Sequence, residues 1–120
     1  MGKFNSFEEI TSWQKATILN RKIYLITHTD AFRKDFDLAR QIRRCSVSIS
    51  SNIAEGFERN TDKEFIHFLY IAKGPAAEVR SQLYLALDLN YISQQTFDDL
   101  FAEVTEISRL LSGFIKYLNK

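Results

Sequence analysis

The chain has 120 residues, enough for one domain with one hydrophobic core and too few for two. Sixteen Lys and Arg residues against fifteen Asp and Glu residues give a formal net charge of +1, so bulk charge does not mark a dedicated nucleic-acid binder. Four Gly residues and one Pro residue are too few for the turns of an all-β chain, which favours an all-α fold.

The first expected helix covers about residues 6–29. Ser6 and Glu9 have the spacing of a capping box, in which each side chain accepts a hydrogen bond from the other residue's backbone N–H. Residues at helical spacing then predict one inward-facing stripe. This stripe comprises Phe7, Ile10, Trp13, Thr17, Tyr24 and Thr27.

The second expected helix covers about residues 36–59 and begins around Asp35. Four serines lie between positions 46 and 51, although serine is a mediocre helix former. Their small side chains allow a neighbouring backbone to come close, and their hydroxyls can bond to carbonyls one turn back. The inward stripe comprises Leu38, Ile42, Cys45, Ile49, Ile53 and Phe57.

The third expected helix covers about residues 62–89 and starts at a second capping box, formed by Thr61 and Glu64. Pro75 lies inside it and withholds the N–H that would bond to the carbonyl of Ile71. Because the apolar spacing resumes in phase afterwards, we expect a kink at Pro75 and a helix end only at Asn90.

The fourth expected helix covers about residues 94–118, with Ser93 as its N-cap. Helices of about 24 residues are about 36 Å long, and four of them joined by short loops pack most economically side by side. The sequence therefore predicts a single domain, residues 1–120, folded as an antiparallel up-down-up-down four-helix bundle.

The third helix carries more apolar surface than one inward stripe can use. Phe68, Tyr70, Tyr84 and Leu85 are candidate oligomer-interface residues, because large exposed apolar patches on a protein usually mark interfaces. The pattern predicts a homo-oligomer. The alternative is that these long side chains bend over the flanks of their own bundle.

The hairpin between the second and third helices sets Arg43 and Arg44 at the height of Glu78. We therefore expect an ion pair across the two helices. Glu55 needs a donor such as Asn52 or Arg59 unless it points outward, because an unpaired buried carboxylate is costly.

Three runs carry a family resemblance: residues 41–44 (Gln-Ile-Arg-Arg), residues 48–57 and residues 68–74, together with Glu78. They closely resemble the 23S rRNA intervening-sequence protein family, also called four helix bundle proteins. The Asn-Ile-Ala-Glu-Gly run at 52–56 is specific to that family. The resemblance covers nearly the whole chain and implies a small bacterial four-helix bundle with no established enzymatic activity.

The same resemblance implies further properties. The motif residues expected to form a structural polar network are Arg44, Asn52, Glu55, Gly56 and Glu78. Related accessory variability determinants of diversity-generating retroelements look like homopentameric barrels that bind nucleic acid through a basic surface. The resemblance therefore implies a homopentamer.

Charge is unevenly distributed along the chain. Residues 1–59 hold ten Lys and Arg against seven Asp and Glu, whereas residues 60–120 hold six against eight. Repetition of the basic half around an oligomer would create a belt of positive potential. The candidate phosphate contacts are Arg33, Lys34, Arg40, Arg43, Arg44 and Arg59.

These observations predict an oligomeric accessory protein that binds RNA or DNA. Two alternatives stay open. The basic face is an ordinary solvated surface, or the protein is a protein–protein interaction scaffold that binds no nucleic acid.

No pattern of catalytic or metal-binding residues is present in the sequence. His28 and His67 lie on different expected helices, and neither has a second His or Cys at helical metal spacing. Cys45 lies on an apolar stripe, which favours an inert thiol. We expect no enzyme activity, metal, cofactor or small-molecule substrate.

The single cysteine suits a reducing compartment. The N-terminal segment lacks the apolar core of a secretory signal, and no apolar run is long enough to span a bilayer. We therefore expect a cytoplasmic protein without membrane contact.

Overall fold

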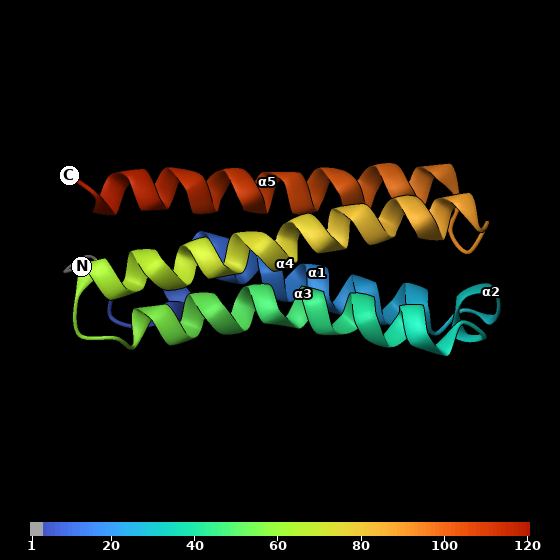
Figure 1. The fold of residues 1–120 in the computed structure, drawn as a ribbon, viewed down its shortest axis with the longest axis horizontal. Helices are drawn as coiled ribbons and strands as arrows, with labels where there is room; N and C mark the ends of the chain where they lie inside the picture. The colour runs from blue at the N-terminus through green and yellow to red at the C-terminus, as the bar shows by residue number, and fades with distance from the viewer. Residues whose placement is uncertain (1–3) are drawn as a thin grey trace.

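A computed structural model describes residues 4–120 of the chain and shows four long helices side by side (Figure 1). These are α1 (Thr11–Thr27), α3 (Phe36–Phe57), α4 (Asp62–Asp88) and α5 (Gln94–Leu118), and the short elements are the 3-10 turn η1 (Phe7–Glu9) and the one-turn helix α2 (Asp30–Arg33). α3 and α5 each pack against both α1 and α4, so the bundle closes in the order α1, α3, α4, α5. Neighbouring helices run in opposite directions, which confirms the antiparallel up-down-up-down bundle.

The bundle is elongated, with extents of 45 × 20 × 19 Å. α2 and the α4–α5 connection lie at one end, which we call the α2 end (Figure 1). The α3–α4 connection and the C-terminus lie at the other, which we call the terminal end. None of the helices in the described part of the chain has the length and apolar character of a transmembrane segment.

The expected first helix over residues 6–29 is divided in two. The capping box does not form, because the Ser6 side chain makes no capping hydrogen bond and Glu9 Oε1 accepts one from the backbone N–H of Asn5 at 3.2 Å. Ile10 has an extended backbone, with φ −79° and ψ 122°, and separates η1 from α1. This conformation turns the Ile10 side chain into the core, where 2% of it stays exposed.

The inward stripe of α1 also differs from the expected one. Tyr24 is 42% exposed, and Trp13 and Thr17 are only partly buried. Bulky rings on the inner stripe would hold α1 away from α3, so smaller side chains occupy it. The buried residues of α1 are Ser12, Ala16, Leu19, Ile23 and Thr27.

The other long helices begin with side-chain caps, which the sequence predicts at Thr61 and Ser93 but not at Asp35. In each case a side-chain oxygen at the N-cap accepts a hydrogen bond from the backbone N–H three residues later. The pairs are Asp35 with Leu38, Thr61 with Glu64 and Ser93 with Thr96, each at 3.1 Å.

α4 continues through Pro75 without ending there. The kink expected at Pro75 stays a prediction. The helix stops at Asp88, and Asn90 follows with a φ of 62°, the left-handed conformation that commonly terminates helices.

The connection between α1 and α3 contains α2, which the sequence analysis did not predict. Phe32 in α2 is fully buried, and its ring centroid lies 5.2 Å from that of Tyr91 in the α4–α5 connection. The Tyr91 hydroxyl donates a hydrogen bond to Asp35 Oδ2 at 3.0 Å. α2 is therefore anchored to the opposite connection, and this anchor positions the start of α3.

α3 and α4 approach closely at Gly56, which is buried. A Cβ atom at this position would lie 2.6 Å from Phe68 Cβ and 2.9 Å from Phe65 Cδ1. The family run at 52–56 therefore ends in a glycine because the facing helix leaves no room for a side chain.

Gly56→Ala is expected to lower the free energy of unfolding by about 1–3 kcal/mol, because the new methyl group overpacks the α3–α4 contact. Urea unfolding followed by circular dichroism measures the change. Ser51→Ala, on the exposed face of the same helix, is the control and should be neutral or slightly stabilising. Equal stability of the two variants would show that α4 is not held this close.

Candidate nucleic-acid interface

Arg40 and Arg44 lie one turn apart on the outer face of α3, near the α2 end. Both are exposed, and with Asp37 and Gln41 they line a shallow hollow of about 240 Å³. Neither forms an ion pair or a hydrogen bond with another side chain within residues 4–120. Free guanidinium groups can bind phosphate oxygens in a bidentate manner, and Asp37 offsets one of the two charges.

An exposed aromatic ring lies beside these arginines. Phe36, the first residue of α3, is 67% exposed, and the Arg40 guanidinium carbon lies 6.0 Å from its ring centroid. Phe36 was not among the candidate residues predicted from the sequence. The available signal was its phase, because Phe36 falls outside the inward stripe that Leu38 and Ile42 define.

Arg43 is committed to α1 and not to α4. Its Nε donates to Thr27 Oγ1 at 2.7 Å, and its guanidinium lies 5.0 Å from the ring centroid of Tyr24. The expected ion pair of Arg43 or Arg44 with Glu78 does not form in the described part of the chain. Arg43 projects from the flank of α3 that faces α1, so the shared height with Glu78 does not bring the two charges together.

The remaining candidate phosphate contacts are divided between the two ends of the bundle. Arg33 pairs with Asp30 at 3.2 Å, and both side chains are largely exposed, so this pair is weak and open to exchange. Lys34 follows α2 and is exposed. Arg59 lies at the terminal end, paired with Glu55 at 3.1 Å, and therefore does not belong to the same cluster.

The expected polar network of family motif residues is not a single network. Asn52 donates to the carbonyl of Ser48 at 2.8 Å, within its own helix. Glu55 pairs with Arg59, one of the two donors that the sequence analysis named for it. Arg44 points outward, so it does not join them.

A polar network that the sequence analysis missed joins α1 to α3. Ser46 Oγ donates to Asn20 Oδ1 at 2.6 Å, and Asn20 Nδ2 donates to Ser50 Oγ at 3.0 Å. Both serines are buried, so Asn20 satisfies the Ser46 hydroxyl inside the bundle and adds a donor to the Ser50 hydroxyl, which itself donates to the carbonyl of Val47 at 3.0 Å. The serines of α3 therefore have a structural role.

Cys45 is buried and receives weak hydrogen bonds at its Sγ atom from Gln82 at 3.7 Å and Gln41 at 3.8 Å. Burial raises the pKa of the Cys45 thiol above its ordinary value, and the nearby Glu78 carboxylate raises this pKa further. The Glu78 side chain of α4 therefore lies close to α3 at Cys45, and not at Arg43 or Arg44 as expected. A protonated, enclosed thiol is unreactive, as the sequence analysis expects.

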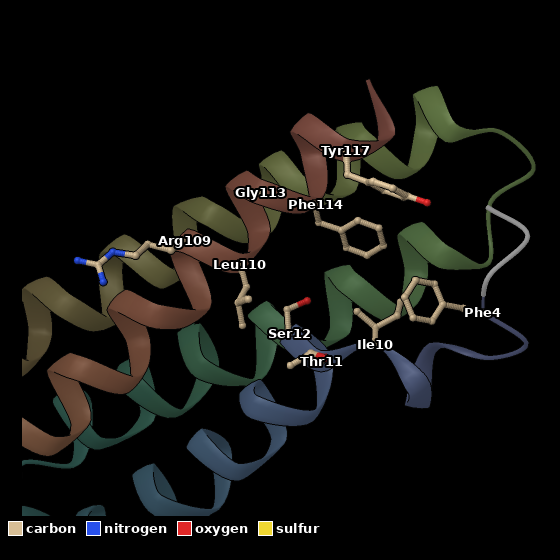
Figure 2. A pocket seen from close by; sticks show the side chains of 9 residues that line it. All are labelled: Phe4, Ile10, Thr11, Ser12, Arg109, Leu110, Gly113, Phe114 and Tyr117. Carbon is tan, nitrogen blue, oxygen red and sulfur yellow. The ribbon is translucent and has the colours of Figure 1, made fainter. Parts of the chain in front are cut away.

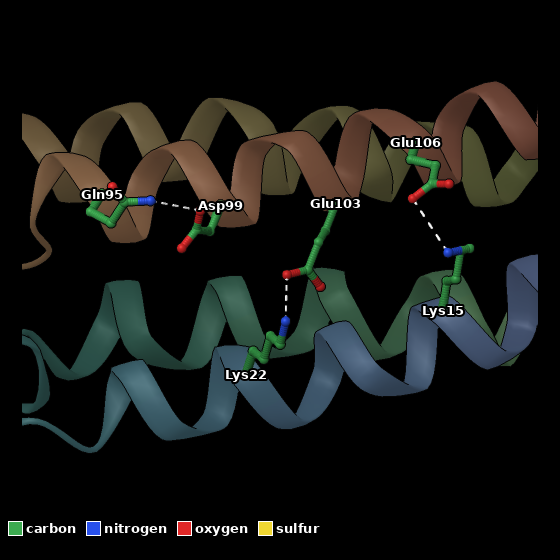
Figure 3. Close-up of polar contacts among 6 residues, drawn as sticks. All are labelled: Lys15, Lys22, Gln95, Asp99, Glu103 and Glu106. Carbon is green, nitrogen blue, oxygen red and sulfur yellow. Dashed lines mark hydrogen bonds and ion pairs between the residues drawn. The ribbon is translucent and has the colours of Figure 1, made fainter.

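Two cations of the basic half are neutralised by α5. Lys22 Nζ lies 2.6 Å from Glu103 Oε2, and Lys15 Nζ lies 3.4 Å from Glu106 Oε1 (Figure 3). These pairs bridge the α1–α5 side of the bundle. The cations left for an anionic ligand are therefore concentrated at the α2 end.

The expected oligomer-interface residues differ in exposure. Tyr70, Tyr84 and Leu85 are 56%, 57% and 46% exposed. Phe68 is half-buried beneath the Arg59 guanidinium, whose carbon lies 4.6 Å from the ring centroid. A single copy therefore leaves three of the four side chains exposed and the fourth half-buried.

Within residues 4–120, no three His, Cys, Asp or Glu side chains gather closely enough to hold a metal ion. The fold and the charged surfaces together define a small antiparallel four-helix bundle with a basic cluster at one end.

The chain belongs to the 23S rRNA-intervening sequence protein family, which matches residues 8–113. It is also similar to the crystal structure of a protein of unknown function from the S23 ribosomal protein family of Bacteroides thetaiotaomicron, with 28% sequence identity and a TM-score of 0.81. That match covers 88% of this chain and 99% of the other. No curated protein matches the chain.

The raised pKa of Cys45 predicts a specific loss of stability in alkali. As the pH rises through the ordinary thiol value of 9.0, the unfolded chain releases the Cys45 proton while the folded chain retains it, so stability falls. Cys45→Ala should therefore show a shallower decline in the free energy of unfolding between pH 8 and pH 10, roughly the range spanned by this titration. Urea unfolding at a series of pH values tests this, and parallel declines would contradict it.

Proposed function

We propose that this protein is a non-enzymatic, cytoplasmic homo-oligomer that binds RNA through the α2 end of its α3 face. The observation that carries the proposal is the exposed Phe36 ring beside free cations of Lys34, Arg40 and Arg44. Proteins that bind single-stranded nucleic acid combine aromatic rings, on which bases stack, with basic side chains that follow the phosphates. The α2 end presents both kinds of group within one short segment of chain.

The distribution of charge over the bundle supports the same surface. α1 contains three basic residues and no acidic residue, and α3 contains three basic residues against two acidic ones. α5 contains four acidic residues against two basic ones. Because Lys15 and Lys22 of α1 are paired with glutamates of α5, an approaching polyanion is attracted mainly to the α3 face and repelled from α5.

Self-association increases this attraction. One copy offers a small net positive charge at the α2 end, because Asp37 lies among the arginines. Several copies in one assembly present the cluster repeatedly to one nucleic-acid strand, and linked weak sites bind far more tightly than a single site. The resemblance to homopentameric accessory variability determinants supports a pentamer, and the subunit number stays a prediction.

A protein-interaction scaffold is the second candidate function. It is favoured by the exposure of Tyr70, Tyr84 and Leu85, which nucleic-acid binding does not require. A different polypeptide that co-purifies with the protein after nuclease treatment, and is lost from a Tyr84→Ala variant, supports this function.

The double variant Arg40→Gln/Arg44→Gln is expected to weaken binding to a single-stranded RNA oligonucleotide and to reduce the slope of log K against log salt by about 1.5, because two phosphate contacts are lost. Filter-binding titrations at two salt concentrations measure both quantities. The matched control Lys15→Gln/Lys22→Gln removes the same charge from side chains already paired with glutamates.

The Lys15→Gln/Lys22→Gln control should leave the affinity for RNA nearly unchanged. Phe36→Ala should weaken RNA binding by removing a stacking surface worth about 1–3 kcal/mol per base. Absence of RNA binding by the wild-type protein at low salt contradicts the proposal, as does an equal loss of affinity in the two double variants. Equal binding of a DNA strand of the same sequence supports phosphate and base stacking as the basis of recognition.

A further inference from the structure

Gly113, in the interior of α5, has no explanation within the described part of one copy, whereas Gly74 in α4 precedes Pro75, whose ring disfavours a helical backbone at a preceding residue that carries a Cβ atom. Apart from the adjacent residues of the chain, a Cβ atom added at either glycine would meet nothing within 4 Å among residues 4–120, in contrast to Gly56. Glycine destabilises a helix interior relative to alanine, so a glycine that gains no room inside the bundle is a cost to it. Close approach of another molecule would account for Gly113, and the same approach at Gly74 would use the space that this glycine leaves on the outer face of α4.

The outer face of α4 has large side chains at both ends and small ones between them. Tyr70, Gly74, Ala77, Ser81 and Leu85 follow one another at helical spacing, and all five are exposed. Tyr70 and Leu85 are separated by 15 positions, or about 22 Å along the helix. Tyr70 and Leu85 project from this face with only small residues between them, so the face can fit a surface that has two hollows at the same spacing.

Such a surface lies between α1 and α5. A hollow of about 380 Å³ at the terminal end is lined by Ile10, Ser12, Gly113 and other residues (Figure 2). A second hollow of about 220 Å³ lies towards the α2 end, where Leu25 and Leu100 line it. Gly113 and Leu100 are 13 positions apart, or about 20 Å along α5, which matches the spacing of the large side chains on α4.

The terminal hollow also contains an unsatisfied polar group. Ser12 is 3% exposed, and its buried Oγ atom has no hydrogen-bond partner within residues 4–120. Figure 2 shows this hydroxyl among the apolar side chains that line the hollow. Buried hydroxyl groups are nearly always hydrogen-bonded, so an occupant with an aromatic body and a hydroxyl tip fits this hollow.

We propose that α4 of one copy docks in the α1–α5 groove of a second copy. Tyr70 enters the terminal hollow and its hydroxyl bonds to Ser12, while Leu85 enters the second hollow. The small residues between them cross the groove where the Lys15–Glu106 and Lys22–Glu103 pairs lie (Figure 3). The proposal rests on the homo-oligomer of the proposed function and names the two surfaces that build it.

The heights of these features along the bundle determine the geometry of the assembly. Tyr70 lies eight positions from the start of α4, about 12 Å, and Gly113 lies five positions from the end of α5, about 8 Å. Both helix ends lie at the terminal end of the bundle (Figure 1). The copies therefore stand side by side at nearly the same height with their long axes parallel.

The two docking surfaces are different, so the contact is heterologous. Copies related by a rotation with little rise form a closed ring and not a filament. The outer face of α3 belongs to neither surface, so Phe36, Arg40 and Arg44 stay accessible in the ring. Assembly and RNA binding therefore use separate parts of the molecule.

Paired lysine variants test the docking without RNA. Gly74→Lys blocks the α4 face and Gly113→Lys blocks the terminal hollow, and apart from the adjacent chain residues neither new Cβ atom meets another atom of residues 4–120 within 4 Å. Gly113→Lys should fold with equal or higher helicity, because lysine is the better helix former. Gly74→Lys places a Cβ atom before Pro75, so circular dichroism checks that this variant retains the helicity of the wild type. Ser112→Lys, exposed on α5 and absent from the lining of the hollow, is the matched control.

Light scattering after size exclusion at micromolar concentration should show an oligomer for the wild type and for Ser112→Lys, and a monomer for each glycine variant. An equimolar mixture of the two glycine variants should give a heterodimer, because one intact α4 face remains to fit one intact groove. If the wild type is a monomer, both the self-association of the proposed function and the docking of α4 in the α1–α5 groove are wrong. An oligomeric wild type whose glycine variants also assemble, or a mixture that stays monomeric, overturns the docking surface alone.

A double-mutant cycle tests the hydrogen bond between the two copies. Tyr70→Phe is placed in the Gly113→Lys copy, which has the intact α4 face, and Ser12→Ala in the Gly74→Lys copy, which has the intact groove. Each substitution should weaken the heterodimer by about 2- to 10-fold, and the two together should weaken it no further than one alone. Multiplication of the two effects in the double variant would show that these side chains do not meet.

Discussion

The close contact of α3 with both of its neighbours is the constraint on which the rest of the bundle depends. On one flank, Gly56 removes the side chain that would collide with Phe68 of α4. On the other, Asn20 of α1 takes up the hydroxyl groups of the buried α3 serines. Because both flanks are used inside the bundle, only the outer face of α3 remains for other molecules. Phe36 and Arg44 lie on that face, which directs nucleic-acid binding to it.

The glycines separate what the fold requires from what an assembly requires. Gly56 is needed by the single chain and Gly74 is favoured by the proline that follows it, whereas Gly113 lies in a helix interior where residues 4–120 leave room for a side chain. Local rules of helix stability are usually broken for a functional reason. Here Gly113 falls in the terminal hollow, and the spacing of the two hollows matches that of the large side chains on the outer face of α4. The same unpaired Ser12 hydroxyl that is a cost to one copy becomes a hydrogen-bond partner for the next.

Much of the fold could be predicted from the sequence because the stripes and caps of the later helices agree, as at Thr61. The first helix could not, because the break at Ile10 serves tertiary burial and has no Gly or Pro signal. For the candidate site, the hairpin register gave the height of Arg43 but not the direction of its side chain, so Glu78 was the wrong partner. Asn20 was missed because its partners lie on another helix, at positions that spacing within α1 does not reveal.

The proposed ring depends on Tyr70 of one copy lying in the terminal hollow of another. The most direct test replaces Tyr70 with a photoreactive benzoylphenylalanine and maps the cross-linked peptides of the illuminated oligomer by mass spectrometry. Intermolecular cross-links to residues around Ser12 in α1 and Gly113 in α5 are expected. Cross-links from position 70 to α4 of a second copy would show a symmetric helix pair and would contradict this docking.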